Sequence, residues 1–290
     1  MKNKSYMYII LAGLLWGTSG IFVNLLVTYG FTALQLTFFR GAVSFVSLGV
    51  YALFHNKSLF RIKRKELLLF LGCGLSFFTT ASCYYYSMQM TSISTAVILM
   101  YTAPIFVMIY SVSFLGEKFT KQKAISVGCM IIGCGLVSGV IGGVEFEIAG
   151  VFWGLLSGVS YSVYNILTKI SMNNKSNPIT TTLYSFLFAT LLGMFVCELP
   201  STLPYIMSNA KVTLLLIVGM GLCTCTVPFF LYTLALKDIP AGTASTLSII
   251  EPMAATVYGV LLFDEALTLS LCGGAALILL SVFLLNKNGL

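Results

Sequence analysis

The sequence predicts an all-α integral membrane protein whose ten transmembrane helices form two inverted five-helix repeats. Three observations predict this fold: the composition, the spacing of the charges and an internal repeat. Of the 290 residues, 58% are hydrophobic and only 9% are charged, whereas soluble domains carry about 25% charged residues. Such a chain cannot cover a water-facing surface. The composition therefore excludes a soluble globular domain, and it also excludes disorder.

Charge-free stretches separate short charged segments along the whole chain. A membrane-spanning helix needs about 20 mostly apolar residues. The gap between Lys4 and Arg40 is long enough for nearly two such helices, and the gap between Lys123 and Glu145 for one. Applied to every gap, this spacing predicts helices at residues 6–27, 33–54, 67–88, 92–115, 122–141, 148–169, 178–197, 212–236, 240–263 and 267–286.

The basic residues predict how these helices are oriented. Lys and Arg residues of membrane proteins concentrate in the cytoplasmic loops. With a cytoplasmic N-terminus, all 16 basic residues fall on the cytoplasmic side except Arg40, within a helix, and Lys211. We therefore expect a multi-pass protein of a bacterial plasma (inner) membrane with both termini in the cytoplasm. The net charge of +7 follows from this topology and requires no nucleic acid partner.

The second half of the chain repeats the first. Residues 84–120 align with residues 232–268 without a gap, and this alignment pairs Pro104 with Pro252. An earlier stretch near Trp16 aligns in the same way with the beginning of the second half. We therefore expect two repeats, at residues 1–141 and at residues 142–290.

Five helices are an odd number, so the second repeat enters the membrane from the opposite side. Glu117 is then cytoplasmic, while its counterpart Glu265 is external. Inverted repeats of this kind are typical of secondary transporters. Two copies of one shape in exchanged conformations give outward-open and inward-open states of similar energy. The repeat thus predicts alternating access around a central cavity.

Short motifs are distributed over both halves of the chain. They are Trp16-Gly17, Phe39-Arg40-Gly41, Ala103-Pro104 with Gly116-Glu117-Lys118, Ala235-Leu236-Lys237, and Glu251-Pro252 with Asp264-Glu265. With these motifs the whole chain resembles the drug/metabolite transporter (DMT) superfamily of the EamA type. The resemblance implies a ten-helix protein with cytoplasmic termini and a central cavity between two bundles. It also implies export or exchange of small metabolites, often amino acids.

Two charged residues fall deep within predicted spans, away from the ends of the helices. A charge in the bilayer core is costly, so such a residue is paired, protonated or functional. Glu251 is either a site for a coupling proton or a substrate ammonium, or a structural acid in a helix kinked by Pro252. Arg40 either binds a substrate carboxylate or phosphate, or bonds helix-terminal carbonyls, or extends outward to the membrane surface. A pair between Arg40 and Glu251 is a further alternative.

Aromatic and polar residues within the spans are candidates for the cavity wall, above all the pairs at corresponding places in the repeats, Trp16 with Tyr161 and Tyr84 with Tyr232. The expected substrate cavity consists of Trp16, Asn24, Tyr84, Tyr101, Tyr161, Asn165, Tyr232 and Ser248. Pro104 and Pro252 occupy the same place in each repeat, and each removes a backbone hydrogen bond and kinks its helix. They are candidate hinges, with a static kink as the alternative.

These features predict a secondary-active transporter for a small metabolite, an amino acid or a similar zwitterion, with protons as a candidate coupling ion. The alternatives are a facilitative channel or uniporter and a non-transporting membrane scaffold. An enzyme is not expected, because the single histidine excludes an H-E-x-x-H zinc site and neither aspartate lies within a predicted span. No cofactor or metal is predicted, and the sequence does not indicate an oligomeric state.

Overall fold

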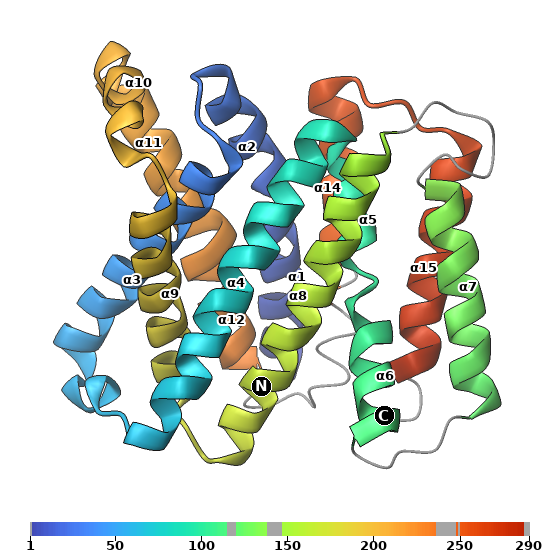
Figure 1. The fold of residues 1–290 in the computed structure, drawn as a ribbon, viewed down its shortest axis with the longest axis horizontal. Helices are drawn as coiled ribbons and strands as arrows, with labels where there is room; N and C mark the ends of the chain where they lie inside the picture. The colour runs from blue at the N-terminus through green and yellow to red at the C-terminus, as the bar shows by residue number, and fades with distance from the viewer. Residues whose placement is uncertain (1, 115–119, 138–146, 236–247, 249, 287–290) are drawn as a thin grey trace.

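In the computed structural model the chain consists of helices and the segments that join them; the structure describes residues 2–114, 120–137, 147–235, 248 and 250–286 (Figure 1). No strand occurs in those residues. The elements in chain order are α1 (Lys2–Gly17), α2 (Ser19–Thr28), α3 (Ala33–His55), η1 (Lys57–Phe60), α4 (Arg64–Met90), α5 (Ile93–Met100), α6 (Ala103–Phe114), α7 (Lys121–Val137), α8 (Ile148–Asn173), α9 (Pro178–Val196), η2 (Leu199–Thr202), α10 (Leu203–Ser208), α11 (Ala210–Gly221), η3 (Leu222–Thr226), α12 (Val227–Ala235), α14 (Ile250–Phe263) and α15 (Leu269–Asn286).

Among the residues that the structure describes, five helical stretches are long and apolar enough to cross a membrane, and α14 and most of α15 form shorter apolar helices. The five stretches are Lys4–Thr28, Ala33–His55, Arg64–Met90, Pro178–Val196 and Ala210–Tyr232. Large apolar side chains such as Phe195 and Leu269 are exposed on the outside of the bundle, as on a surface that faces lipid. The protein is thus an all-helical membrane protein. Ten crossings and an inverted repeat stay predictions; the predicted repeat boundary at 141/142 and Glu117 lie outside the described residues.

Polar caps and prolines fix where helices begin. Thr32 and Gln35 form a capping box at the start of α3, in which each side chain accepts a hydrogen bond from the backbone of the other. At the start of α9 the side chain of Asn177 accepts from the amide of Ile179 at 2.9 Å, and Pro178 occupies the first turn. Both arrangements satisfy or remove amide donors that a helix leaves unpaired at its N-terminus.

Several predicted spans are interrupted helices. The span predicted at residues 92–115 divides into α5 and α6 at residues 101–102, directly before Pro104 in the first turn of α6. Proline fits a first helical turn but cannot continue a preceding helix, because it has no amide hydrogen. Likewise, the span predicted at 212–236 contains the π-helical turn η3 between α11 and α12, and Pro228 follows that turn. At the second break the carbonyl oxygen of Thr224 accepts a hydrogen bond from the side chain of Arg40.

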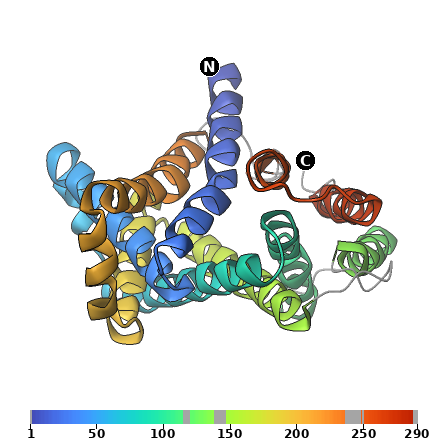
Figure 2. The same ribbon diagram turned by 90° about the horizontal axis from the view of Figure 1, so that it is seen from above.

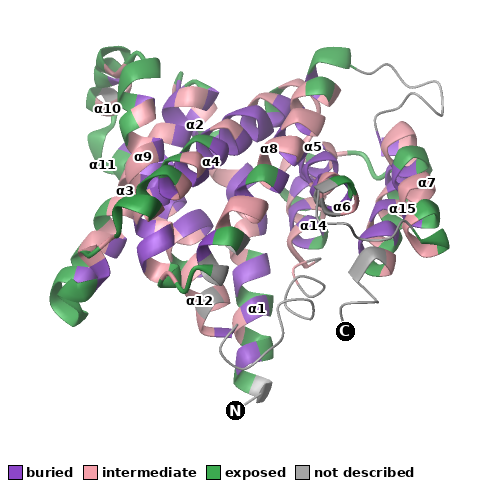
Figure 3. Ribbon diagram, turned by 60° about the horizontal axis from the view of Figure 1, so that its bottom comes forward, coloured by how far each residue is buried: buried purple, intermediate pink, exposed green. Residues whose placement is uncertain are grey.

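The helices pack as one bundle with an outlying pair. Seen from above, α7 and α15 lie side by side at one end of the molecule, away from α3, α9 and α11 (Figure 2). Gly133 of α7 meets Gly274 of α15: a Cβ atom at Gly133 would lie 2.9 Å from the Gly274 carbonyl oxygen. Buried residues concentrate in the middle of the bundle, along α4 in particular, and exposed residues at its ends and outer faces (Figure 3).

The antiparallel helices α5 and α14 are joined by hydrogen bonds at both ends. Where α5 begins, the carboxylate of Glu265 accepts from the amide of Ile93 at 2.6 Å. Where α5 ends, the Tyr101 hydroxyl donates toward Glu251, in the first turn of α14. Asp264 ends α14 in a left-handed conformation (φ 54°), which directs the chain so that Glu265 reaches α5.

Candidate functional site

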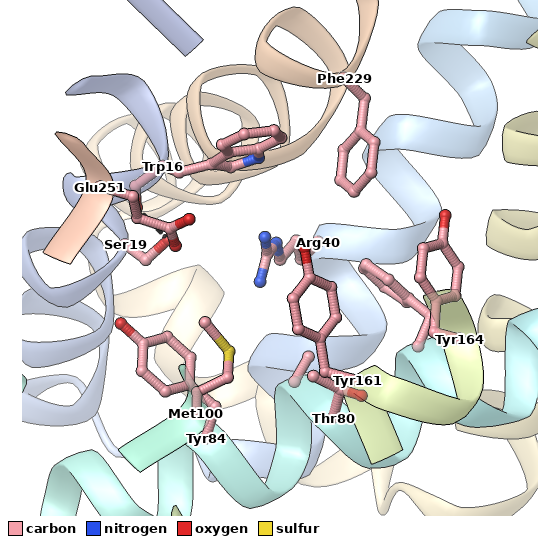
Figure 4. Close-up of a pocket in the computed structure, with 12 residues that line it drawn as sticks. Trp16, Ser19, Arg40, Thr80, Tyr84, Met100, Tyr161, Tyr164, Phe229 and Glu251 are labelled. Carbon is pink, nitrogen blue, oxygen red and sulfur yellow. Dashed lines mark hydrogen bonds between the residues drawn. The ribbon is translucent and has the colours of Figure 1, made fainter. Parts of the chain in front are cut away.

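A cavity lies inside the bundle (Figure 4). Most of its wall is aromatic, and two side chains of opposite charge complete it. The lining residues are Trp16 of α1, Ser19 of α2, Arg40 of α3, Phe77, Thr80, Ala81 and Tyr84 of α4, Met100 of α5, Tyr161 and Tyr164 of α8, Phe229 of α12 and Glu251 of α14.

Arg40 is buried, with 8% of its surface exposed, and part of its hydrogen bonding is structural. Its Nη2 donates to the backbone carbonyl of Thr224 at 2.8 Å. That carbonyl would normally accept from the residue four positions later, but this residue is Pro228, which has no amide hydrogen. The arginine therefore supplies the donor that the helix lacks. Nη1 donates to the hydroxyl of Tyr85 at 3.1 Å.

The guanidinium of Arg40 also has an N–H group that donates to no acceptor among the described residues. A guanidinium carries five N–H donors, and Nε of Arg40 is buried without a partner among the described residues. The rings of Phe77 and Tyr85 lie 5.6 and 5.9 Å from its central carbon, within the range of a cation–π interaction. A buried donor without an acceptor is costly, so the site favours a ligand that brings an acceptor oxygen.

Glu251 forms the opposite side of the cavity. Its Oε2 accepts from the hydroxyl of Tyr101 at 2.9 Å, and the same hydroxyl lies 2.9 Å from the carbonyl oxygen of Ser248. A hydroxyl has one hydrogen, so Tyr101 divides it between these two acceptors. Among the described residues no donor reaches the other carboxylate oxygen of Glu251, which leaves one oxygen for a ligand or a proton.

The two charges face the same space without pairing. Figure 4 shows the guanidinium of Arg40 and the carboxylate of Glu251 on facing sides of the cavity, with Trp16 and Tyr161 nearby. Within the described part of the chain they form no ion pair, that is, no N···O distance of 4.0 Å or less. The alternative of an Arg40–Glu251 ion pair does not occur in this structure.

The structure brings most of the predicted cavity residues to this place. Trp16, Tyr84 and Tyr161 line the cavity together with both charges. Others of the predicted set lie directly behind the wall: the Tyr232 ring contacts Trp16 at 5.7 Å between centroids, and Asn165 interacts with the Tyr161 side chain.

Three further predicted residues stand apart from the lining. The Tyr101 hydroxyl donates to the Glu251 side chain, and the Ser248 carbonyl accepts from the Glu251 amide; neither residue lines the cavity itself. Asn24, on α2, is half-buried and is not a lining residue. The candidate hinges both lie in first helical turns, Pro104 in α6 and Pro252 in α14. The break before Pro104 is observed, whereas movement at either proline stays a prediction.

Sequence reasoning missed a group of lining residues that helical periodicity could have found. Phe77, Thr80 and Ala81 precede Tyr84 at the i, i+3, i+4 and i+7 spacing of a single helix face. Tyr164 follows Tyr161 by three residues in the same way. Ser19, Met100 and Phe229 carried no comparable signal. No group of three or more His, Cys, Asp or Glu side chains in the described residues could hold a metal ion.

Known proteins similar to this chain are transporters. The chain is 29% identical over 277 residues to an uncharacterized transporter of Archaeoglobus fulgidus, covering 95% of this chain and 94% of that protein. It is 25% identical to an uncharacterized transporter of Bacillus subtilis, covering 99% and 95%. It is also 23% identical to an S-adenosylmethionine uptake transporter of Rickettsia felis, covering 84% and 80%.

A solved crystal structure shares the fold of this protein. It superposes with a TM-score of 0.66 over 98% of this chain and 96% of that one, at 17% sequence identity. The sequence profile of the EamA-like transporter family matches residues 3–139 and, separately, residues 148–287. Since these two matches cover nearly the whole sequence, the chain belongs to the EamA-like transporter family, within the drug/metabolite transporter superfamily that its motifs indicate.

Proposed function

We propose that this membrane transporter moves a small zwitterionic metabolite, such as an amino acid, by export or exchange. One observation carries the proposal: a single cavity presents a guanidinium and a carboxylate on facing walls, and the two do not pair with each other. A ligand with a carboxylate and an ammonium group satisfies Arg40 and Glu251 at once. The aromatic walls then contact the remainder of the ligand.

Alternating access is the mechanism that the arrangement favours. Arg40 belongs to the first predicted repeat (1–141) and Glu251 to the second (142–290), so the cavity lies between the two halves. The separate matches of the family profile to each half support this division. In the proposed cycle the halves rock about the cavity, with Pro104 and Pro252 as hinges, in a bacterial inner membrane with both termini cytoplasmic.

Glu251 is the proposed coupling site. A carboxylate with one free oxygen binds either a proton or a substrate ammonium, and each excludes the other. Exchange of one zwitterion for another then needs no proton, whereas net transport driven by a pH difference does. In a channel or uniporter, exchange and net transport would not differ in their need for a proton. A scaffold would show no flux.

A second substrate class follows from the aromatic walls. Aromatic rings beside a carboxylate also bind organic cations. One relative is named an S-adenosylmethionine uptake transporter, and that molecule carries both an amino acid group and a sulfonium cation. Uptake of such a ligand is the candidate to compare with export of simple amino acids.

Reconstituted liposomes test these proposals. Vesicles containing the purified protein are loaded with a mixed pool of amino acids and S-adenosylmethionine, and mass spectrometry follows which solutes leave with and without a pH step. We expect saturable, selective loss of one zwitterionic class. Linear, unsaturated loss would favour a channel, and no loss with folded protein would favour the scaffold.

The role of Glu251 has a matched control. Glu251→Gln keeps the shape of the side chain but removes its charge and its ability to release a proton. We expect it to abolish pH-driven net transport, whereas exchange continues with a raised apparent KM, because the amide oxygen still accepts from the substrate ammonium but carries no charge. Glu198→Gln, at an exposed position outside the cavity, should leave both modes intact. Equal loss of both modes, or of neither, would contradict a coupling role.

A further inference from the structure

The segment that connects α3 to α4, residues 57–65, carries a dense group of basic side chains. We refer to it as the basic segment. All of its cations are exposed, and none makes an ion pair within the part of the chain that the structure describes. They are Lys57, Arg61, Lys63, Arg64 and Lys65.

The acid nearest to these cations is occupied by other contacts. One carboxylate oxygen of Glu66 accepts from the backbone amide of Lys63 at 2.7 Å, which caps α4. The other accepts from the hydroxyl of Ser176, in the turn between α8 and α9. This bond also brings the exposed Lys175 to the same end of the bundle. The positive charges of the basic segment therefore remain available to an external anion.

The backbone of the basic segment is fixed against α9. The Leu59 side chain is buried, and its carbonyl accepts from the hydroxyl of Thr180 at 2.9 Å. The carbonyl of Phe60 accepts from the Tyr184 hydroxyl at 2.8 Å. Binding at this surface thus requires little ordering of the chain, and the cost of ordering is a main term that opposes association.

Exposed apolar residues on both sides show at what depth the cations lie. Phe54, at the end of α3, is 83% exposed, and Leu68, near the start of α4, is 75% exposed. In a membrane protein such side chains contact lipid tails. The basic segment lies just beyond them, at the end of the bundle that also holds the N-terminus (Figure 1), which is the level of the lipid headgroups.

We propose that the basic segment, with Lys175, is a binding site for the headgroups of anionic phospholipids. Clusters of four to eight Lys and Arg residues next to a membrane helix attract anionic lipids. A zwitterionic headgroup carries its own ammonium, which opposes binding to a surface of unpaired cations. An anionic headgroup presents phosphate oxygens without that ammonium, and therefore complements this site.

The test measures lipid binding to the intact protein in detergent, independently of transport. Dioleoyl-phosphatidylglycerol and dioleoyl-phosphatidylcholine are titrated separately, and native mass spectrometry counts the molecules retained. We expect the anionic lipid to bind at least about tenfold more tightly, and the preference to vanish at 1 M salt, where the screening length falls to about 3 Å. Equal retention of the two lipids would overturn the proposal, as would a preference that survives high salt.

Charge variants distinguish lipid binding at this site from a general effect of the protein's net charge. The triple variant Arg61→Gln, Arg64→Gln, Lys65→Gln should weaken phosphatidylglycerol binding at least about tenfold. The control triple removes the same charge from three exposed lysines elsewhere and should change binding less than about twofold. Its substitutions are Lys4→Gln, Lys121→Gln and Lys211→Gln.

Two further arms complete the test. If the triple variant fails to fold, the charge-keeping variant Arg61→Lys, Arg64→Lys replaces it and should retain the preference for the anionic lipid. Equal weakening by both triples would show that net charge alone attracts the lipid and would overturn the site. Displacement of the lipid by 50 mM inorganic phosphate at constant ionic strength would assign the site to free phosphate instead.

Discussion

Replacing Glu265 by alanine should weaken the contact between α5 and the end of α14. In the structure Oε1 of Glu265 accepts from the amide of Ile93 at 2.6 Å, and Oε2 accepts from the amide of Ser94 at 3.2 Å and from its hydroxyl at 2.6 Å. The first amides of a helix have no partner within the helix. One carboxylate from a distant part of the sequence therefore satisfies two of them in α5, and the Ser92 side chain satisfies the amide of Thr95.

The expected loss for Glu265→Ala is about 2–4 kcal/mol. A hydrogen bond to a charged group contributes about 1.5–3 kcal/mol, and a negative charge at a helix N-terminus about 0.3–1 kcal/mol. The three bonds share one half-buried carboxylate, so their separate values do not add in full. Glu265→Gln should cost about half as much. The side-chain amide keeps one oxygen that can accept from α5, but its NH2 group cannot accept and so leaves the other donors of α5 without a partner.

Hydrogen exchange of the α5 amides measures this contact directly. A loss of about 2–4 kcal/mol corresponds to a fall in protection of about 30- to 1,000-fold at Ile93 and Ser94. Glu198→Ala is the matched control, because Glu198 is exposed and its side chain makes no capping bond. Unchanged protection in Glu265→Ala, or an equal fall in both variants, would refute the role of this carboxylate in holding α5.

Three other variants address the cavity and the packing. Arg40→Lys keeps the charge but loses the fork-shaped donor group, so the apparent KM for a zwitterion in liposomes should rise, while unchanged kinetics would indicate a structural role alone. Tyr101→Phe removes the hydroxyl that donates to Glu251 and should lower the free energy of unfolding by about 1 kcal/mol, measured by denaturant titration. Gly133→Val should destabilise the protein by about 1–3 kcal/mol through overpacking. Gly128 lies in the same helix, but a Cβ atom added there would meet no packing atom within 4 Å, so Gly128→Val should be tolerated in the same titration.

The sequence predicts where helices lie better than where they break. Charge-free gaps placed spans at 33–54 and 178–197, close to the observed α3 and α9, because apolar length is what a bilayer selects. Hydropathy does not report the hydrogen-bond register, and so the π-helical turn η3 left no signal in it. Pro228 did carry a signal, since a proline after an apolar stretch frees a carbonyl, but its partner Arg40 is distant in sequence.

Repeat equivalence pointed to some of the residues that line the cavity of this structure, but not to the limits of the cavity. It pointed to Trp16, Tyr161 and Tyr84, which line the wall, and to Tyr232, whose ring packs behind Trp16. In α12 the cavity wall is formed instead by Phe229, one turn earlier. A sequence alignment gives the face of a helix, whereas the depth at which a cavity ends depends on how the other helices cross it.

The two ends of the α5–α14 pair differ in what can reach them. Glu265 binds the start of α5 away from the cavity, whereas Tyr101 binds Glu251 at the cavity wall. In the proposed cycle, a proton or an ammonium on the free oxygen of Glu251 reduces the negative charge of the carboxylate and so weakens its bond from Tyr101, and the hydroxyl then turns to the carbonyl of Ser248. On this proposal, ligand binding changes the hydrogen bonds at one end of the pair, while the bonds of Glu265 to Ile93 and Ser94 lie at the other end, away from the cavity. An unequal response of this kind is what the proposed alternating access requires.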